Sequence, residues 1–271
     1  MNLRLVKSQI IRNIFSFRFL FVIIIGYVLT YIELHSTNRW GEIGKENFLL
    51  YTMIFDRIGL VTMYFLLGLP FIASLVGGSL YGQEVRSNRN LFHLARLSKK
   101  TYVVSLSIAS FILGGLASIV PLMINLVTAA FKMPSLQVEL GNFSIYGEKF
   151  FAQNWAMVHP FSMIALVLGI YFIFGGLFAL FSLSISYFYA NQLIEILGVF
   201  IISFVSNLLL EIIKLGNLHF YAFLDFIGVS ETDDLFPLVI INAICWMLCI
   251  LVIQYIESKR DVLQVKQKSL R

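Results

Sequence analysis

The fold class that this sequence predicts is an all-α integral membrane protein with six transmembrane helices. Hydrophobic residues make up 59% of the 271-residue chain and charged residues only 13%, whereas about 25% of a typical soluble domain is charged. A helix needs about 20 apolar residues to cross a bilayer. Runs of about that length recur at 15–32, 58–81, 102–131, 161–190, 193–213 and 236–256. We therefore expect a single transmembrane domain, residues 1–271.

The distribution of Lys and Arg predicts the orientation of the spans, because cytoplasmic loops retain basic residues. With the amino terminus inside, 14 of the 20 basic residues fall on the cytoplasmic side and 11 of the 15 acidic residues fall on the other. Both termini are therefore expected in the cytoplasm. The net charge of +5 then reflects membrane topology, and we expect no nucleic-acid partner.

Residues 1–17 have the pattern of an amphipathic interfacial helix that leads into the first span. Apolar side chains recur every three or four positions and most cations fall on the other side; the apolar set is Leu3, Val6, Ile10, Ile14 and Phe17. Such a helix is expected to lie flat on the cytoplasmic leaflet, where anionic headgroups attract its cations. The alternative is a frayed basic leader.

Residues 215–235, before the last span, form a second unusual segment. Aromatic and aliphatic side chains, including Phe220, Tyr221 and Leu224, precede an acidic cluster. This pattern predicts a re-entrant segment that dips into the outer leaflet and packs against the spans, since its backbone needs protein or water partners there. A loop that lies on the outer surface is the alternative.

The sequence contains no motif for a nucleotide, a metal or a catalytic centre. A P-loop does not occur, and the four histidines are scattered singly in loops. The serine within 77–82 is flanked by glycines, but no span holds a histidine that could act as its base. Close helix packing explains these glycines better, because Gly78 and Gly82 have the small-xxx-small spacing. Cys245 and Cys249 lie one turn apart in an apolar run and are expected to be packing residues. We expect no catalytic residue and no directly bound cofactor.

Residues 82–101, the only sizeable cytoplasmic loop, mix apolar side chains with many cations. Leu91 and Leu94 are spaced to share one face of a short helix, with Phe92 nearby, as docking into a partner's groove requires. A solvated basic loop is the alternative. The candidate site residues are Glu84, Arg89, Leu91, Phe92, Leu94 and Arg96.

Together these features resemble the permease subunits of type-2 ABC transporters, which are mostly bacterial exporters. The resemblance covers nearly the whole chain. It rests on the basic leader, the six spans, Glu84 at the close of the second span, and the Ser-Lys-Lys-Thr-Tyr sequence at 98–102 that starts the third. The chain departs from the family pattern where Leu97 or Ala95 replaces a common proline and Ser105 replaces a lysine.

The resemblance implies the membrane-spanning subunit of an ATP-driven exporter in a bacterial plasma membrane. Residues 82–101 would couple it to a separate ABC ATPase subunit, present in two copies, which would bind ATP and Mg. Glu84 would hold the geometry of the loop, while Leu91, Phe92 and Leu94 would fill the groove of the ATPase. A second permease copy or a paralogous permease would complete the pathway within the membrane lipid. The alternatives are a membrane sensor or anchor without transport, and an intramembrane lipid-modifying enzyme.

Overall fold

The computed structural model describes residues 2–36, 52–54, 60–132, 158–189, 191–216, 219–224 and 235–258. In this part of the chain, six helices are long and apolar enough to cross a membrane. They are α2 (Phe17–Ser36), α3 (Leu60–Ala73) with the π-helix η3 (Ser74–Gly78), α6 (Lys99–Lys132), α9 (Pro160–Ser186), α10 (Gln192–Ile212) and α12 (Leu235–Ser258). The four remaining helices are α1 (Leu3–Ile14), α4 (Leu80–Arg86), α5 (Arg89–Arg96) and α11 (Phe220–Leu224). The prediction of an all-α protein with six spans is confirmed, and the fold is that of a multi-pass membrane protein.

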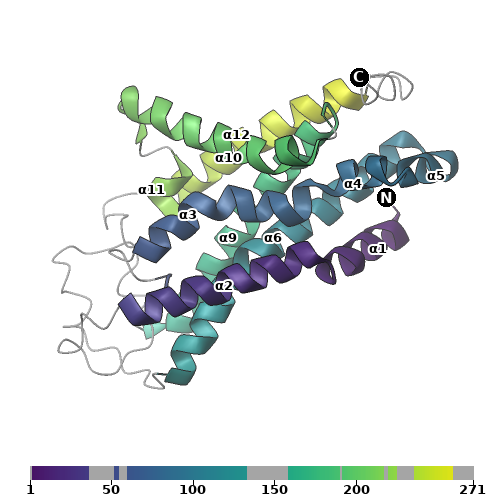
Figure 1. Cartoon of the computed structure of the whole chain (residues 1–271). Coiled ribbons are helices and arrows are strands. Elements are labelled where there is room, and N and C mark those ends of the chain that lie inside the picture. Colours follow the sequence, from purple (N-terminus) through teal and green to yellow (C-terminus); the bar gives the residue numbers. More distant parts are fainter. Residues whose placement is uncertain are drawn as a thin grey trace, which may run out of the picture.

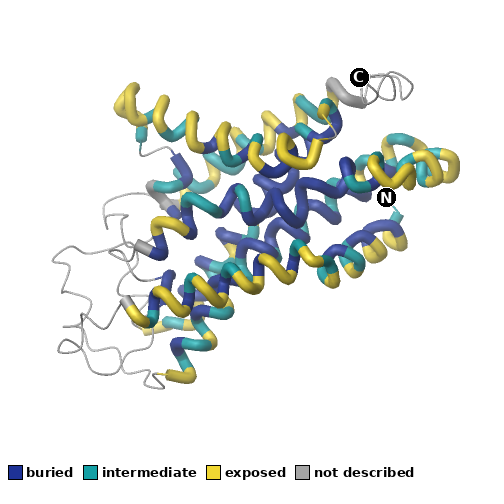
Figure 2. The backbone as a smooth tube through the Cα atoms, in the orientation of Figure 1, coloured by how far each residue is buried: buried dark blue, intermediate teal, exposed yellow. Residues whose placement is uncertain are grey.

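The six long helices lie side by side and alternate in direction along the chain (Figure 1). Helix α9 is central and packs against α3, α6, α10 and α12, and the most buried segments lie in the middle of the bundle (Figure 2). Helices α10 and α12 expose most of their apolar surface. Helices α1, α4 and α5 gather at one end, which also holds the last described turn of α12 (Figure 1). The location of this end in the cytoplasm stays a prediction.

Helices α6 and α9 approach closely because each presents glycines to the other. A side chain at Gly114 would meet the carbonyl oxygen of Gly175 at 2.6 Å. At the next residue of each helix, the ring of Phe111 covers Gly176 and the ring of Phe172 covers Gly115. Helix α6 has 34 residues, or about 51 Å at 1.5 Å per residue, so it is longer than the roughly 30 Å hydrocarbon core of a bilayer. Its first turns extend to the end that holds α1 and α5.

The second span is not the continuous α-helix that its composition suggests. Pro70 lies inside α3 and offers no backbone N–H for a helical hydrogen bond. The helix then widens into the π-turn Ser74–Gly78 and bends at Ser79 before α4 begins. Short π-helical segments of this kind are frequently found at functional sites.

Helix α1 confirms the predicted amphipathic helix but begins and ends inside the predicted range of 1–17. The side chain of Asn2 caps its first turn by accepting hydrogen bonds from two backbone N–H groups. Its buried face contains Gln9 and Asn13 beside Leu5 and Val6, so part of the polar side faces protein. Its position flat on a lipid leaflet stays a prediction.

Helix α11 is the described helix within the predicted re-entrant segment. Phe220 and Leu224 are buried. The Phe220 ring meets that of Phe178 on α9 edge-on at 4.8 Å, and the hydroxyl of Tyr171 donates to the carbonyl of Leu224 at 3.0 Å. This short helix therefore packs against the spans and has a protein partner for its backbone, as expected. Residues 217–218 and 225–234 lie outside the described residues, and insertion of the segment into a membrane stays a prediction.

His219, which precedes α11, is held in its neutral form. Its side chain is 3% exposed, and burial lowers its pKa to about 4, although a hydrogen bond to the Ser203 backbone favours the charged form. The N–H of Tyr221 donates to Nδ1 at 3.4 Å, and Nε2 lies 3.2 Å from the hydroxyl of Ser206. A second proton on Nδ1 would face the Tyr221 N–H, so protonation opposes the docked arrangement.

The two cysteines differ from expectation. Cys245 and Cys249 are free and exposed on α12, so their prediction as packing residues within the chain is wrong. Periodicity showed that they share a helix face, but a chain of uniformly apolar residues does not reveal which face turns inward.

Candidate functional site

Residues 82–101 fold into two short helices and the start of a third. Helix α4 ends at Arg86, and Asn88 adopts the left-handed conformation with φ of 56°, which Asn tolerates better than most residues. Helix α5 then runs back from Arg89 to Arg96, and the Ser98 hydroxyl accepts a hydrogen bond from the N–H of Thr101 at the start of α6. The predicted short helix is confirmed.

No residue of helix α5 is fully buried, and one side of the helix is exposed along its length. Leu91 is 45% exposed and Phe92 is 69% exposed, and Arg89 and Arg96 are exposed as well. Leu94 instead lies half-buried against the hydrophobic core. The structure therefore separates the candidate residues into an outer group of two apolar side chains and two cations, and an inner group that anchors the helix.

A buried carboxylate provides the anchor, and we call its four residues the Glu84 cluster: Gln9, Arg12, Glu84 and His93. Glu84 has no exposed surface. Its Oε1 accepts from Arg12 Nη2 at 2.8 Å and from Gln9 Nε2 at 3.1 Å, and its Oε2 lies 3.3 Å from His93 Nε2. One side chain of α4 is thus hydrogen-bonded to α1 and lies within ion-pair distance of His93 on α5. A buried charge is tolerated only where such partners compensate for lost hydration.

His93 also links the Glu84 cluster to α6. Its ring stacks on that of Tyr102 with centroids 5.9 Å apart and planes 22° apart. Tyr102 is almost fully buried. The inner side of α5 is therefore fixed both to Glu84 and to the first turns of the third span.

A second buried carboxylate, Glu195, joins the start of α10 to α4. Arg86 donates to both of its oxygens, at 3.0 and 3.2 Å, and a side chain at Gly82 would collide with this carboxylate. The Ser182 hydroxyl of α9 donates to the backbone carbonyl of Glu195. Close packing at the glycines of 77–82 is confirmed, and a methyl group at Gly82 would have to displace the Glu195 carboxylate.

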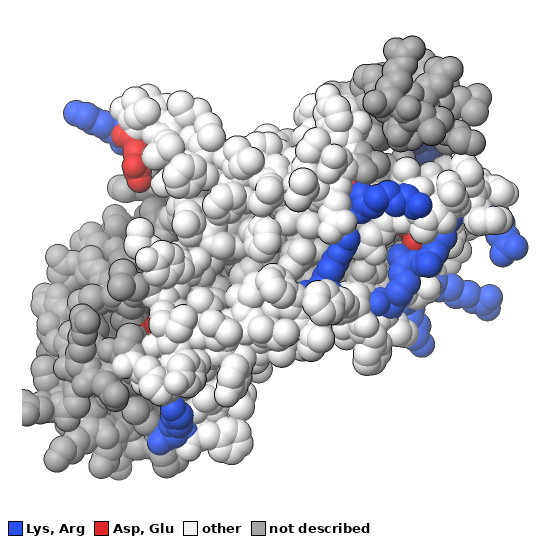
Figure 3. Space-filling view, viewed as in Figure 1, with Lys and Arg blue, Asp and Glu red and all other residues white. Residues whose placement is uncertain are grey.

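The surface at this end is strongly cationic. The carboxylates of Glu84 and Glu195 are buried, whereas most of the described cations at this end reach the surface, as Figure 3 shows for one face. These cations are Arg4, Lys7, Arg12, Arg18, Arg86, Arg89, Arg96, Lys99 and Lys100. Such a surface suits an acidic partner or anionic headgroups. Among the described residues, no group of His, Cys, Asp and Glu could hold a metal ion.

Comparison with known proteins adds no relative: no family model, no curated protein and no solved structure matches this chain.

Proposed function

We propose that this chain is the membrane-spanning subunit of an ATP-driven ABC exporter, and that residues 82–101 couple it to a separate ATPase subunit. The observation that carries the proposal is the construction of α5. Its outer side presents Leu91 and Phe92 among cations, while its inner side is fixed through the Glu84 cluster. A helix built in this way offers apolar anchors to a partner and passes the partner's movement to the membrane helices.

The rest of the assembly follows from the same proposal. Two ATPase subunits bind ATP and Mg, and a second copy of the chain or a paralogous permease covers part of the exposed apolar surface of α10 and α12, with lipid covering the remainder. The cationic end faces the cytoplasm of a bacterial cell, as the retention of Lys and Arg on that side favours.

The test is co-purification of an ATPase with the tagged chain from its native cells. The Leu91→Ala/Phe92→Ala variant removes two side chains that are each worth roughly 1.5–3 kcal/mol when fully buried. If each side chain contributes only half of this free energy to binding, the double variant weakens the complex about tenfold or more. A loss of about 1.4 kcal/mol corresponds to a factor of ten in affinity. The matched control is Val158→Ala/Phe161→Ala, at residues that are 69% and 64% exposed at the opposite end.

Wild type and the control are expected to retain the ATPase, and the α5 variant is expected to lose it. Glu84→Gln should assemble but transport less per ATP hydrolysed, because it alters the anchor of α5 and not its outer surface. If no ATPase co-purifies with the wild type, the exporter assignment fails. An assembled complex that hydrolyses ATP without moving any substrate would support a sensor or anchor instead.

A further inference from the structure

A cavity between α1 and the α4–α5 turn lies beside the Glu84 cluster. Its volume is about 230 Å³, below the roughly 300–1,000 Å³ of a typical small-molecule site, so it suits a single small group. Six residues line it: Arg12, Asn13, Ser16, Gln83, Ser87 and Arg89. All are polar or charged, and none is acidic.

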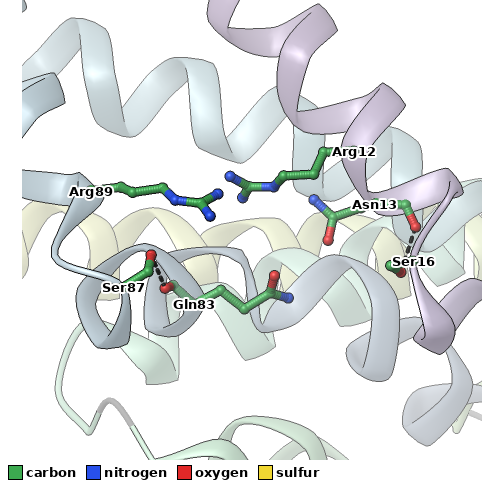
Figure 4. Close-up of a pocket in the computed structure, with 6 residues that line it drawn as sticks. All are labelled: Arg12, Asn13, Ser16, Gln83, Ser87 and Arg89. Carbon is green, nitrogen blue, oxygen red and sulfur yellow. Dashed lines mark hydrogen bonds between the residues drawn. The ribbon is translucent and has the colours of Figure 1, made fainter.

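The two guanidinium groups of Arg12 and Arg89 point toward one another across this cavity (Figure 4). Arg12 uses Nη2 for both Gln9 and Glu84, which leaves its Nη1 and Nε without a hydrogen-bond partner among the described residues. Arg89 has no hydrogen bond or ion pair within that part of the chain. Two like charges aimed at one space repel each other unless an anion lies between them.

The other lining groups shape the cavity. The hydroxyls of Ser16 and Ser87 donate to the backbone carbonyls of Asn13 and Gln83 at 2.6 and 2.7 Å, so their protons are directed away from a ligand. Arg89 is the first residue of α5, whose N-terminus has no side-chain cap. The partial positive charge of that helix start adds to the charge of the guanidinium.

We infer that this cavity binds a phosphate group, and that its source is the headgroup of an anionic lipid. Arginine pairs bind phosphate through forked, charge-assisted hydrogen bonds, which a planar guanidinium supports better than an ammonium group. The lipid source follows from the neighbours of Ser16. Phe15 and Phe17, the sequence neighbours of Ser16, are 85% and 77% exposed, so apolar rings are available to acyl chains at the junction between α1 and the first span.

A bound headgroup would connect α1 to α5 by a second route beside Glu84. Its removal would leave Arg89 without a counter-charge, whereas Arg12 would keep Glu84, and it would loosen α5. The inference does not depend on the proposed ATPase partner, because the chain alone forms the cavity.

The test measures lipid binding to the purified chain in an uncharged detergent by native mass spectrometry. The probes are short-chain phosphatidylglycerol, short-chain phosphatidylcholine and inorganic phosphate. Arg89→Gln removes one guanidinium without touching Glu84, Arg89→Lys keeps the charge but loses the forked geometry, and Arg4→Gln removes an exposed cation of α1 that does not line the cavity.

Phosphatidylglycerol should bind saturably to the wild type and to Arg4→Gln. It should bind about tenfold more weakly to Arg89→Gln, since a hydrogen bond to a charged group is worth about a factor of ten or more in affinity. Arg89→Lys should have an intermediate affinity. Binding of inorganic phosphate alone, with the same dependence on Arg89, would keep the phosphate site but overturn its lipid source. Equal weakening in Arg4→Gln and Arg89→Gln, or no saturable binding of any probe, would overturn the site.

Discussion

Removal of the cation from the Glu84 cluster should destabilise the protein more than removal of the acid. In Arg12→Gln, the carboxylate of Glu84 stays buried and keeps only Gln9 and His93 as partners. In Glu84→Gln, the remaining guanidinium has a side chain that is 34% exposed and can be solvated, and the new amide oxygen can still accept its hydrogen bond. The two substitutions disrupt the same contact but leave very different groups behind.

The structure sets the size of each effect. Breaking a buried ion pair by removing one partner costs about 3–5 kcal/mol, and the lower end applies to Arg12→Gln because Arg12 is partly exposed and Gln9 still donates a hydrogen bond to Glu84. About 3 kcal/mol corresponds to a loss of roughly 6–12 °C in melting temperature for a chain of this size. Glu84→Gln exchanges a charge-assisted hydrogen bond for a neutral one and should cost about 1 kcal/mol.

The assay is the apparent melting temperature in detergent at a fixed heating rate, followed by the loss of the monodisperse peak. The double variant Arg12→Gln/Glu84→Gln should be more stable than Arg12→Gln alone, because no uncompensated charge remains. Arg4→Gln, an exposed cation on the same helix, is the control. A melting temperature of Arg12→Gln equal to that of Arg4→Gln, or a double variant that loses the sum of both single effects, would contradict the role assigned to Glu84.

Three further predictions concern other parts of the fold. Gly82→Ala should lower the stability by about 1–3 kcal/mol, since its methyl group displaces the buried carboxylate of α10. The control Gly169→Ala, whose methyl group meets nothing within 4 Å, should be tolerated in the same melting assay. Equal losses of melting temperature would exclude the close approach of α4 to Glu195. Acidification should weaken the docking of 219–224 by up to about 1.4 kcal/mol per pH unit between pH 6.5 and about 4, because in this pH range His219 is protonated only when the segment is undocked. The measurement is amide exchange of this segment, which should be faster at pH 5 than at pH 7 after correction for intrinsic rates. Unchanged exchange would contradict the prediction. A single cysteine at Asn90, in a background without the native cysteines, should resist an impermeant reagent on intact cells; labelling there would reverse the predicted orientation.

The spans were predictable because each depends on the average apolarity of about 20 residues, which composition alone determines. The amphipathic leader was predictable from its period of three to four. The interruption of the second span was less visible, although Pro70 and the glycines at 77–78 were available as signals. The apolar composition of these residues favours a membrane segment. The local geometry depends on the proline, which lacks a backbone N–H, and on the glycines, which lack side chains.

The site was predictable only in part, because its interactions join residues distant in the sequence. Arg12 and Glu84 are 72 positions apart and Arg86 and Glu195 are 109 apart, and no local spacing predicts either pair. A usable signal existed in both cases. An acid at the end of an apolar span can be buried where that end packs against other helices, and a buried carboxylate needs a compensating partner such as a cation. Gln9 and Asn13 had no such signal, since a polar face that packs on protein resembles one that faces water.

Helix α4 is the element at which the two buried carboxylates meet, and this position bears on how a movement of α5 would spread under the proposed function. Glu84 binds α4 to α1 and α5, whereas Glu195 binds Arg86 of α4 to α10. A push on α5 therefore reaches α1 through one ion pair and α10 through the other, and neither route crosses the apolar core. Helix α1 continues into α2, which with α10 exposes much of its apolar surface. Helix α2 packs on α6 at Gly26 and α10 packs on α9, so we expect the movement to appear as a shift of these two helices against the α6–α9 pair.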